Sequence, residues 1–155
     1  MQLYRERLWP SVWVFAATAL VIPASLLVFL PISPTAGQIT AALLYAGCVA
    51  ALIATSPVIE VTGAEVTAGR ARLPIRFAGV PEAFEKEQAT LERGQRLDAR
   101  AWLVIRGWIS PVVKIPVTDQ ADPAPYWLVS TRRPAALAAA ITEARGGAGS
   151  VPRSV

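Results

Sequence analysis

Two long apolar segments stand near the start of the chain, and no charged side chain interrupts either of them. The first, residues 11–30, reads SVWVFAATALVIPASLLVFL, and the second covers residues 39–57. A helix of about twenty residues rises roughly 30 Å, the thickness of the hydrocarbon core of a bilayer. Both segments are therefore predicted to be transmembrane helices, and Pro23 predicts a modest kink in the first.

The connection between the two spans, residues 31–38, contains two prolines and a glycine and is too short to hold a domain. The spans are therefore predicted to form an antiparallel hairpin with an extracytoplasmic turn. Arg5 and Arg7 precede the first span, and the connection carries no cation. The second span is followed by three arginines: Arg70, Arg72 and Arg76. This charge pattern predicts a multi-pass membrane protein with both termini cytoplasmic, residues 1–10 being a cytosolic N-terminal segment.

An alternative for residues 11–30 is a cleavable signal peptide, because Arg5 and Arg7 would supply its positive start. The apolar stretch is longer than the roughly 7–15 residues usual in a signal peptide. No clear small-x-small cleavage site follows Leu30, and a second apolar segment follows at once. We therefore favour a membrane span.

The second span carries alanine at every fourth position, namely Ala42, Ala46, Ala50 and Ala54. A stripe of small residues lets another helix approach closely in lipid, where association depends on packing. We expect this stripe to pack on the first helix, although a chain generally rich in alanine would give the same pattern.

From residue 58 the pattern changes from continuously apolar to alternating apolar and polar, which is typical of half-buried strands. Residues 58–68 predict a hairpin that turns at Gly63. Residues 80–96 are polar and predict at most a helical turn around residues 82–86. Further strands are expected at residues 71–77, 99–108, 112–118 and 126–129, with residues 112–118 paired to residues 99–108.

The last regular element is predicted to be a helix within TRRPAALAAAITEARGG. Thr131 can cap it, Pro134 suits its first turn, and glycines at 146 and 147 are expected to stop it. Its apolar stripe is expected to consist of Leu137, Ala138 and Ile141. Residues 58–145 then form the cytosolic domain, and residues 146–155 are predicted to be a disordered tail.

This order of elements predicts an α+β membrane protein. A transmembrane hairpin is followed by a small, strongly bent sheet or split barrel, capped by a C-terminal helix. The pleckstrin-homology fold has this order of elements.

The composition of the chain excludes several kinds of binding and catalytic site. The chain is 54% hydrophobic and 17% charged with a net charge of +4 and no histidine. Its single cysteine, Cys48, lies within the second span, so no intrachain disulfide and no thiolate metal site are expected. Basic residues are interspersed with acidic ones, which does not favour nucleic acid as a partner. Asp119 and Asp122 are expected to stabilise turns rather than to bind a metal.

Catalytic motifs are missing as well, since the sequence has no G-x-S-x-G and no Walker or dinucleotide-binding glycine pattern. The densest group of charges, Glu82, Glu85, Lys86 and Glu87, is expected to be a solvated surface. We therefore predict a protein that is not an enzyme and needs no cofactor.

Two sets of side chains are candidates for binding. Tryptophan and arginine dominate the energetics of protein interfaces, so Arg106, Trp108 and Trp127 are candidates for a contact with a protein partner, although packing in the core is the default role of such aromatic rings. Arginines near a membrane can bind anionic lipid headgroups, whether or not they converge on one site. The candidates for that contact are Arg70, Arg72, Arg76, Arg132 and Arg133.

Several segments also resemble a known family. The opening YRERLWP, the later RAWLVIRGWISPVVKIPVTD and DPAPYWLVSTRRP, and the alanine-rich helix after them resemble the actinobacterial family catalogued as domain of unknown function 3093. The resemblance extends from about Tyr4 to Arg145, and its most specific segments are RGW and PYWLVSTRRP. It implies the two-span topology and a pleckstrin-homology-like cytosolic domain, and it implies no catalytic residues.

Together these observations predict a membrane-anchored, non-enzymatic adaptor or accessory subunit that presents its cytosolic domain to a protein partner. The competing prediction is a module that responds to anionic lipid, and a membrane-bound enzyme is a third, weaker alternative.

Overall fold

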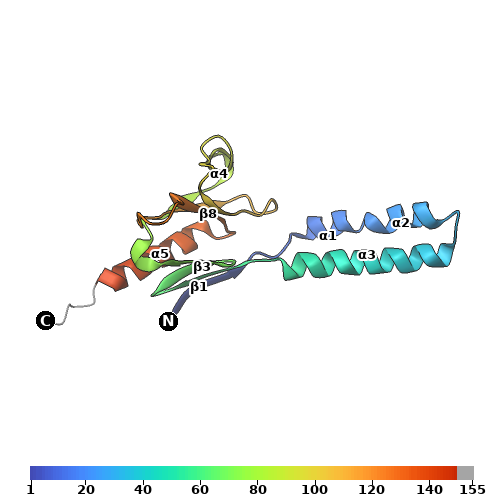
Figure 1. Cartoon of the computed structure of the whole chain (residues 1–155), viewed down its shortest axis with the longest axis horizontal. Coiled ribbons are helices and arrows are strands. Elements are labelled where there is room, and N and C mark those ends of the chain that lie inside the picture. The colour runs from blue at the N-terminus through green and yellow to red at the C-terminus, as the bar shows by residue number, and fades with distance from the viewer. Residues whose placement is uncertain (150–155) are drawn as a thin grey trace. The chain divides into compact units, whose positions relative to one another are not determined.

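The computed structural model describes residues 1–149, which fall into two compact units (Figure 1). Trp9–Ser56 forms a helical unit, and among the described residues Met1–Leu8 together with residues 57–149 forms an α+β domain. The helical unit is therefore an insertion into the domain. The prediction of two apolar N-terminal helices, antiparallel strands and a C-terminal helix is confirmed.

The helical unit consists of α1 (Val12–Thr18), α2 (Val21–Phe29) and α3 (Pro34–Ala54), with α1 and α2 both packed on α3. Two helical stretches, Val12–Phe29 and Pro34–Ala54, are long and apolar enough to cross a membrane by length and composition. Helix α3 begins with the pattern usual for a helix start. The Ser33 side chain accepts a hydrogen bond from the backbone N–H of Ala36, and Pro34 occupies the first turn.

The first stretch is interrupted between α1 and α2, one turn before Pro23. Proline has no N–H to donate to the carbonyl of residue 19, four positions earlier. Instead, the N–H of Ile22 donates to Ala19 at 3.0 Å, and the N–H of Leu20 donates to Ala17 at 3.2 Å. These shorter-range bonds tighten the chain locally, so the predicted irregularity is present and lies N-terminal to the proline.

The prediction for the alanine stripe of the second span is wrong. Ala42, Ala46, Ala50 and Ala54 are all exposed within the helical unit. The buried residues of α3 are Gly37 and Ala41, and a side chain at Gly37 would lie within 3.2 Å of Phe29 Cβ. The close approach between the helices therefore uses a different pair of small residues, nearer to the connecting turn.

The first sheet contains four antiparallel strands in the order β1-β2-β3-β4: β1 (Gln2–Arg7), β2 (Val58–Thr62), β3 (Glu65–Ala68) and β4 (Ala71–Pro74). The predicted hairpin at Gly63 is confirmed, with Val61 opposite Val66. Gly69 turns the chain from β3 to β4 with φ of +65°, a conformation that favours glycine.

The prediction that residues 1–10 are only a cytosolic segment before the first span is wrong, because β1 is a strand of the first sheet. Arg7 pairs with Val58, and the backbone N–H of Leu8 donates to the carbonyl of Pro57 at 3.0 Å. Tyr4 and Leu8 are buried in the core. The domain therefore includes the N-terminus, and its chain leaves and returns at two adjacent points, Leu8 and Pro57.

The second sheet has the strand order β5-β7-β8-β6 and comprises β5 (Glu82–Phe84), β6 (Trp102–Val104), β7 (Val112–Pro116) and β8 (Tyr126–Ser130). The predicted strand at residues 99–108 is reduced to three residues, and β6 pairs in parallel with β8. Its predicted partner, β7, lies between β5 and β8 instead. The turn η1 (Ile75–Phe77) and the helix α4 (Lys86–Arg93) complete the connections, so the helical turn expected at residues 82–86 is displaced by a strand and then a helix.

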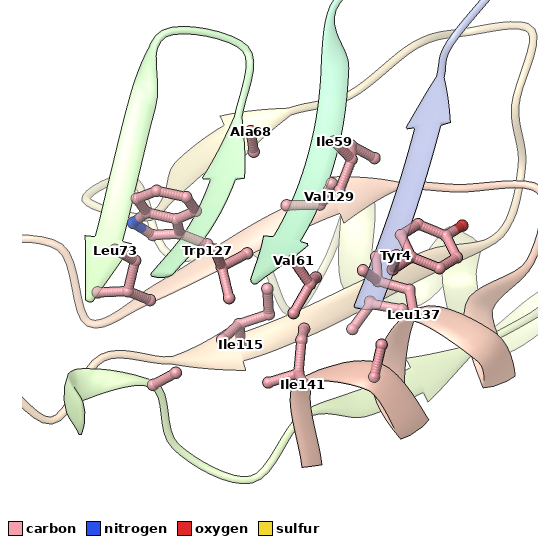
Figure 2. Close-up of a cluster of buried hydrophobic side chains, with 14 of the residues drawn as sticks. Tyr4, Ile59, Val61, Ala68, Leu73, Ile115, Trp127, Val129, Leu137 and Ile141 are labelled. Carbon is pink, nitrogen blue, oxygen red and sulfur yellow. The ribbon is translucent and has the colours of Figure 1, made fainter. Parts of the chain in front are cut away.

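Helix α5 (Pro134–Gly149) contacts β1 and β2 of the first sheet and β5 and β7 of the second. Figure 2 shows its Leu137 and Ile141 beside core side chains from both sheets. The stripe is completed by Ala140 and Ala144, at helical spacing, rather than by Ala138.

The predicted end of this helix is wrong, because α5 continues through Gly146 and Gly147 to Gly149. Neither glycine has a positive φ, so neither adopts the left-handed conformation that ends many helices. The predicted disorder of the remaining tail, residues 150–155, lies outside the described residues.

Candidate interaction surfaces

A buried carboxylate connects β1 to the segment that precedes α5. Side chains alternate along a strand, so Glu6 points inward between the core residues Tyr4 and Leu8 and is 8% exposed. Its Oε2 accepts hydrogen bonds from the Tyr4 hydroxyl at 2.6 Å and from Thr131 Oγ1 at 2.5 Å. Its Oε1 accepts from the backbone N–H of Arg132 at 3.0 Å. A buried carboxylate needs such partners, and here they come from both ends of the domain.

Tyr4 is held in this network on several sides. Its hydroxyl lies 3.1 Å from Thr131 Oγ1, and the Arg133 guanidinium lies 5.0 Å from the centre of its ring. Burial, followed by the hydrogen bond to Glu6, raises the pKa of Tyr4 above 10.0. The fold therefore favours the neutral phenol, and this stabilisation is present below pH 10.0 and is lost as the pH rises through the raised pKa.

Arg132 and Arg133 therefore do not surround an empty anion site at the start of α5. The backbone N–H of Arg132 is already paired with the Glu6 carboxylate, and the N–H of Arg133 donates to Thr131 Oγ1 at 3.1 Å. The Arg133 guanidinium donates to the carbonyl of Arg5 at 3.3 Å. Both side chains are exposed, but the helix start itself is occupied by the chain's own carboxylate.

Arg70 lies in the turn before β4, Arg72 on β4 and Arg76 in η1 after it, and β4 is at the opposite edge of the first sheet from β1. Three strand spacings separate these edges, or about 14 Å. Arg72 pairs with Glu65 at 3.4 Å, and the Arg76 guanidinium lies 4.7 Å from the centre of the Phe77 ring. The structure therefore does not bring the five predicted lipid-contact arginines together in one site.

The three residues predicted for a partner contact have different surroundings. Trp127 is 4% exposed and belongs to the core shared by the two sheets, so it has the packing role expected by default and is not a candidate for the partner contact. Trp108 is half-buried, and its indole Nε1 has no hydrogen-bond partner within residues 1–149. Arg106 is half-buried, and its backbone N–H donates to Ser130 Oγ at 3.1 Å.

Core packing is also the default expectation for Trp102, but its side chain is exposed. It lies on β6, the edge strand of the second sheet, and is 45% exposed. Its ring centre is 6.4 Å from that of Trp127, at the margin of the core. The next residue, Leu103, points to the other face of the sheet and is 44% exposed. Half-exposed apolar side chains thus flank both faces of a strand edge that pairs with no other strand within residues 1–149.

Some acidic residues form ion pairs or stabilise turns, and others are simply exposed to solvent. Glu92 is 4% exposed and pairs with Lys114 at 3.0 Å and Arg96 at 3.3 Å. Glu82, Glu85 and Glu87 are exposed, as expected. The carboxylates of Asp119 and Asp122 accept backbone hydrogen bonds from the residues two positions after each, which confirms their turns. Among residues 1–149, no group of three or more His, Cys, Asp or Glu side chains could hold a metal ion.

Comparison with known proteins identifies the family to which the chain belongs. The model of the family described as protein of unknown function (DUF3093) matches residues 3–141, nearly all of the described chain, and the chain belongs to this family. No curated protein and no solved structure matches the chain significantly. The segments YRERLWP and STRRP, which carry the resemblance to the family, contain the residues that meet in the hydrogen-bond network of Glu6. Two segments far apart in the sequence are therefore joined in the fold by this network.

Proposed function

We propose that this family member is an integral protein of a bacterial cell membrane. Its two spans anchor a cytoplasmic domain that binds a protein partner, and it serves as a non-enzymatic adaptor or accessory subunit. The observation that carries the adaptor proposal is the open edge of β6, with Trp102 and Leu103 half-exposed on its two faces.

Membrane insertion is supported by the large apolar surface of the two helical stretches that the protein itself does not cover. Only 6% of Val12–Phe29 and 11% of the apolar window in Pro34–Ala54 is buried within the protein. The core helix of a soluble protein would be mostly covered by its own chain. A bilayer would supply the missing apolar surroundings for both helices.

The connectivity of the domain supports the topology. The chain leaves the first sheet at Leu8 and returns at Pro57, which are hydrogen-bonded neighbours. Two consecutive spans that start and finish beside one another on a single domain fit a hairpin, whose ends lie on the same side of the membrane. The arginines at both ends, and their lack in the turn, favour the cytoplasm for that side.

The domain is proposed to be pleckstrin-homology-like. The proposal is supported by a C-terminal helix that packs on antiparallel strands, although these strands form two sheets of four with one shared core rather than a single bent sheet. The additional features of this chain are a first strand separated from the second by the helical insertion and a parallel pair at the edge of the second sheet.

Partner binding is proposed to occur by strand addition at β6. An edge strand presents unpaired backbone N–H and C=O groups, which can pair with an extended segment of another protein. Trp102 and Leu103 would contact apolar side chains on alternate faces of that added strand. Tryptophan is also the residue type that most often contributes a large share of binding energy.

The proposal is tested with the double variant Trp102→Thr/Leu103→Thr, which removes both apolar side chains and keeps residues suited to a strand. After gentle detergent extraction and crosslinking, we expect recovery of the partner to fall at least about tenfold, because hot-spot side chains contribute roughly 2 kcal/mol or more each. Val80→Thr is the matched control, since Val80 is 61% exposed and lies outside β6.

The same experiment can contradict the adaptor proposal. Recovery of the partner at equal levels from both variants would place the contact elsewhere. Failure of the unaltered protein to retain any partner in several mild detergents would remove the basis for an adaptor. Thermal unfolding of each extracted protein checks that the substitutions leave the fold intact.

The second candidate function is a response to anionic lipid. It is favoured by the exposure of Arg70 and Arg76, neither of which pairs with a carboxylate within residues 1–149. Each arginine near an anionic membrane surface contributes about 1 kcal/mol, in a salt-dependent way. Strong, arginine-dependent binding to anionic vesicles, with no partner at β6, would favour this candidate over the adaptor.

A further inference from the structure

A pocket of about 430 Å³ lies where η1, the segment after β7 and α5 meet. Its lining consists of Ile75, Arg76, Ala78, Thr118, Arg145 and Ala148. Ile75 and Ala78 are almost fully buried and give the pocket an apolar floor. The volume falls in the range of roughly 300–1,000 Å³ that is typical of small-molecule sites.

The walls of this pocket are fixed by backbone contacts. Both the backbone N–H and the hydroxyl of Thr118 donate to the carbonyl of Phe77, at 2.8 and 3.0 Å. Ala78 forms an isolated β-bridge with Val117. These bonds join η1 to the segment after β7, so the pocket is formed by the fold without any ligand.

Neither of the two arginines that line this pocket has an ion-pair partner within residues 1–149. The four ion pairs found within residues 1–149 involve Arg72, Arg96, Arg100 and Lys114, and neither Arg76 nor Arg145 takes part in one. The guanidinium of Arg76 lies over the Phe77 ring, a contact that restricts its orientation and does not consume its N–H donors. Two cations that line one pocket repel each other, and an anion bound between them would offset that repulsion.

We propose that this pocket binds a phosphate group carried on a small organic group of about the size of glycerol. The guanidinium fork matches the oxygens of a phosphate and can donate two parallel hydrogen bonds to it. The floor formed by Ile75 and Ala78 would contact the carbon skeleton next to the phosphate. This site uses none of the residues at the β6 edge, so it does not depend on the adaptor proposal.

The phosphate could belong to a lipid headgroup or to a soluble phosphate ester, and two arms of one experiment separate these sources. In the first arm, sn-glycerol 3-phosphate is titrated calorimetrically into the full chain in a neutral detergent. In the second arm, the full chain is placed in phosphatidylcholine nanodiscs with or without phosphatidylglycerol, and its thermal unfolding is compared. Binding in the first arm identifies a soluble ester as a ligand, and stabilisation in the second arm alone identifies the lipid.

The decisive variant is Arg76→Gln/Arg145→Gln. We expect it to weaken binding at least about tenfold in whichever arm is positive, because charge-assisted hydrogen bonds to phosphate are the strongest ones available in the pocket. The matched control is Arg5→Gln/Lys86→Gln, which removes the same charge from two exposed basic residues outside the pocket. The control is expected to change binding less than about twofold, apart from the general salt-dependent attraction.

A lysine pair, Arg76→Lys/Arg145→Lys, keeps both charges but cannot form the planar fork. It is expected to bind more weakly than the natural protein and more tightly than the glutamine pair. It also tests the site if the glutamine pair does not fold. Equal losses in the glutamine pair and in its control, or no binding by the unaltered chain in either arm, would overturn the proposal.

Discussion

A chain in which residues 9–56 are replaced by a short turn is expected to fold as a soluble domain, whereas residues 57–149 alone are expected not to fold. In the natural chain, β1 and β2 are neighbouring antiparallel strands, with Leu8 and Pro57 hydrogen-bonded across their ends. A turn such as Asn-Gly, with one or two flanking residues, is suited to connect two strands in this arrangement.

The fragment that lacks β1 would lose a large part of its core. Tyr4 and Leu8 are 7% and 0% exposed, and burial of side chains of this size contributes roughly 1.5–3 kcal/mol each. Loss of β1 also leaves β2 as an unpaired edge and removes Glu6 from Thr131. The combined loss is comparable with the roughly 5–15 kcal/mol by which a domain is usually stable.

The two chains are compared by circular dichroism and by the dispersion of their amide NMR signals. The chain with the short turn should give a spectrum rich in strand with a contribution from α4 and α5, and it should unfold cooperatively. The fragment 57–149 should be unfolded or aggregated. A well-folded fragment without β1 would contradict the assignment of the N-terminus to this domain.

Replacing Glu6 by alanine is expected to destabilise the domain by roughly 2–4 kcal/mol, because two buried donors and one half-buried donor would lose their acceptor at once. These donors are the hydroxyls of Tyr4 and Thr131 and the backbone N–H of Arg132. For a domain of about 100 residues this corresponds to a fall in Tm of roughly 10–25 °C. Thermal unfolding of the full chain in mild detergent, followed by tryptophan fluorescence, measures the change.

Two controls define the cause of this effect. Glu6→Gln keeps a carbonyl acceptor and most of the volume, so its loss should be smaller than that of the alanine variant. Glu82→Ala removes an exposed glutamate from the edge strand β5 and should change stability by less than about 0.5 kcal/mol. Equal effects of Glu6→Ala and Glu82→Ala would show that the buried network does not stabilise the fold.

The sequence predicts the elements whose pattern is set locally. Continuous apolar stretches mark the helical unit, and the alternation around Gly63 marks β2 and β3. The terminal helix is recognisable from Pro134 and from the spacing of Leu137 and Ile141. Each of these signals depends on the periodicity of neighbouring residues, which the chain carries without reference to distant segments.

The elements that were missed depend on distant partners. Strand β1 contains three charged residues, and only its pairing with β2, beyond an insertion of about fifty residues, gives them a place in a sheet. The sequence of β6 predicts a longer strand, but its pairing with β8 rather than with β7 limits it to three residues. Successive strands usually pair as hairpins, so the sequence favours pairing of β6 with β7. In the structure β6 pairs with β8 instead, through a crossover connection.

The candidate surfaces show the same limitation. Trp102 and Trp127 are similar in the sequence, and only the order of strands makes one an edge residue and the other a core residue. Arg145 gives no signal by itself and becomes a candidate because the fold places it in a pocket with Arg76. The pairing of Glu6 with Thr131 joins residues 125 positions apart, so no local pattern could indicate it.

The most direct test of the account is the orientation of the chain in the membrane. Single cysteines at Thr35 and at Gln120, both exposed positions, are introduced in a Cys48→Ser background and treated with an impermeant maleimide in intact cells. A hairpin with a cytoplasmic domain predicts labelling at position 35, in the first turn of α3, and protection at position 120 until the cells are permeabilised. Labelling at position 120 with protection at position 35, or equal labelling of both, would contradict the account.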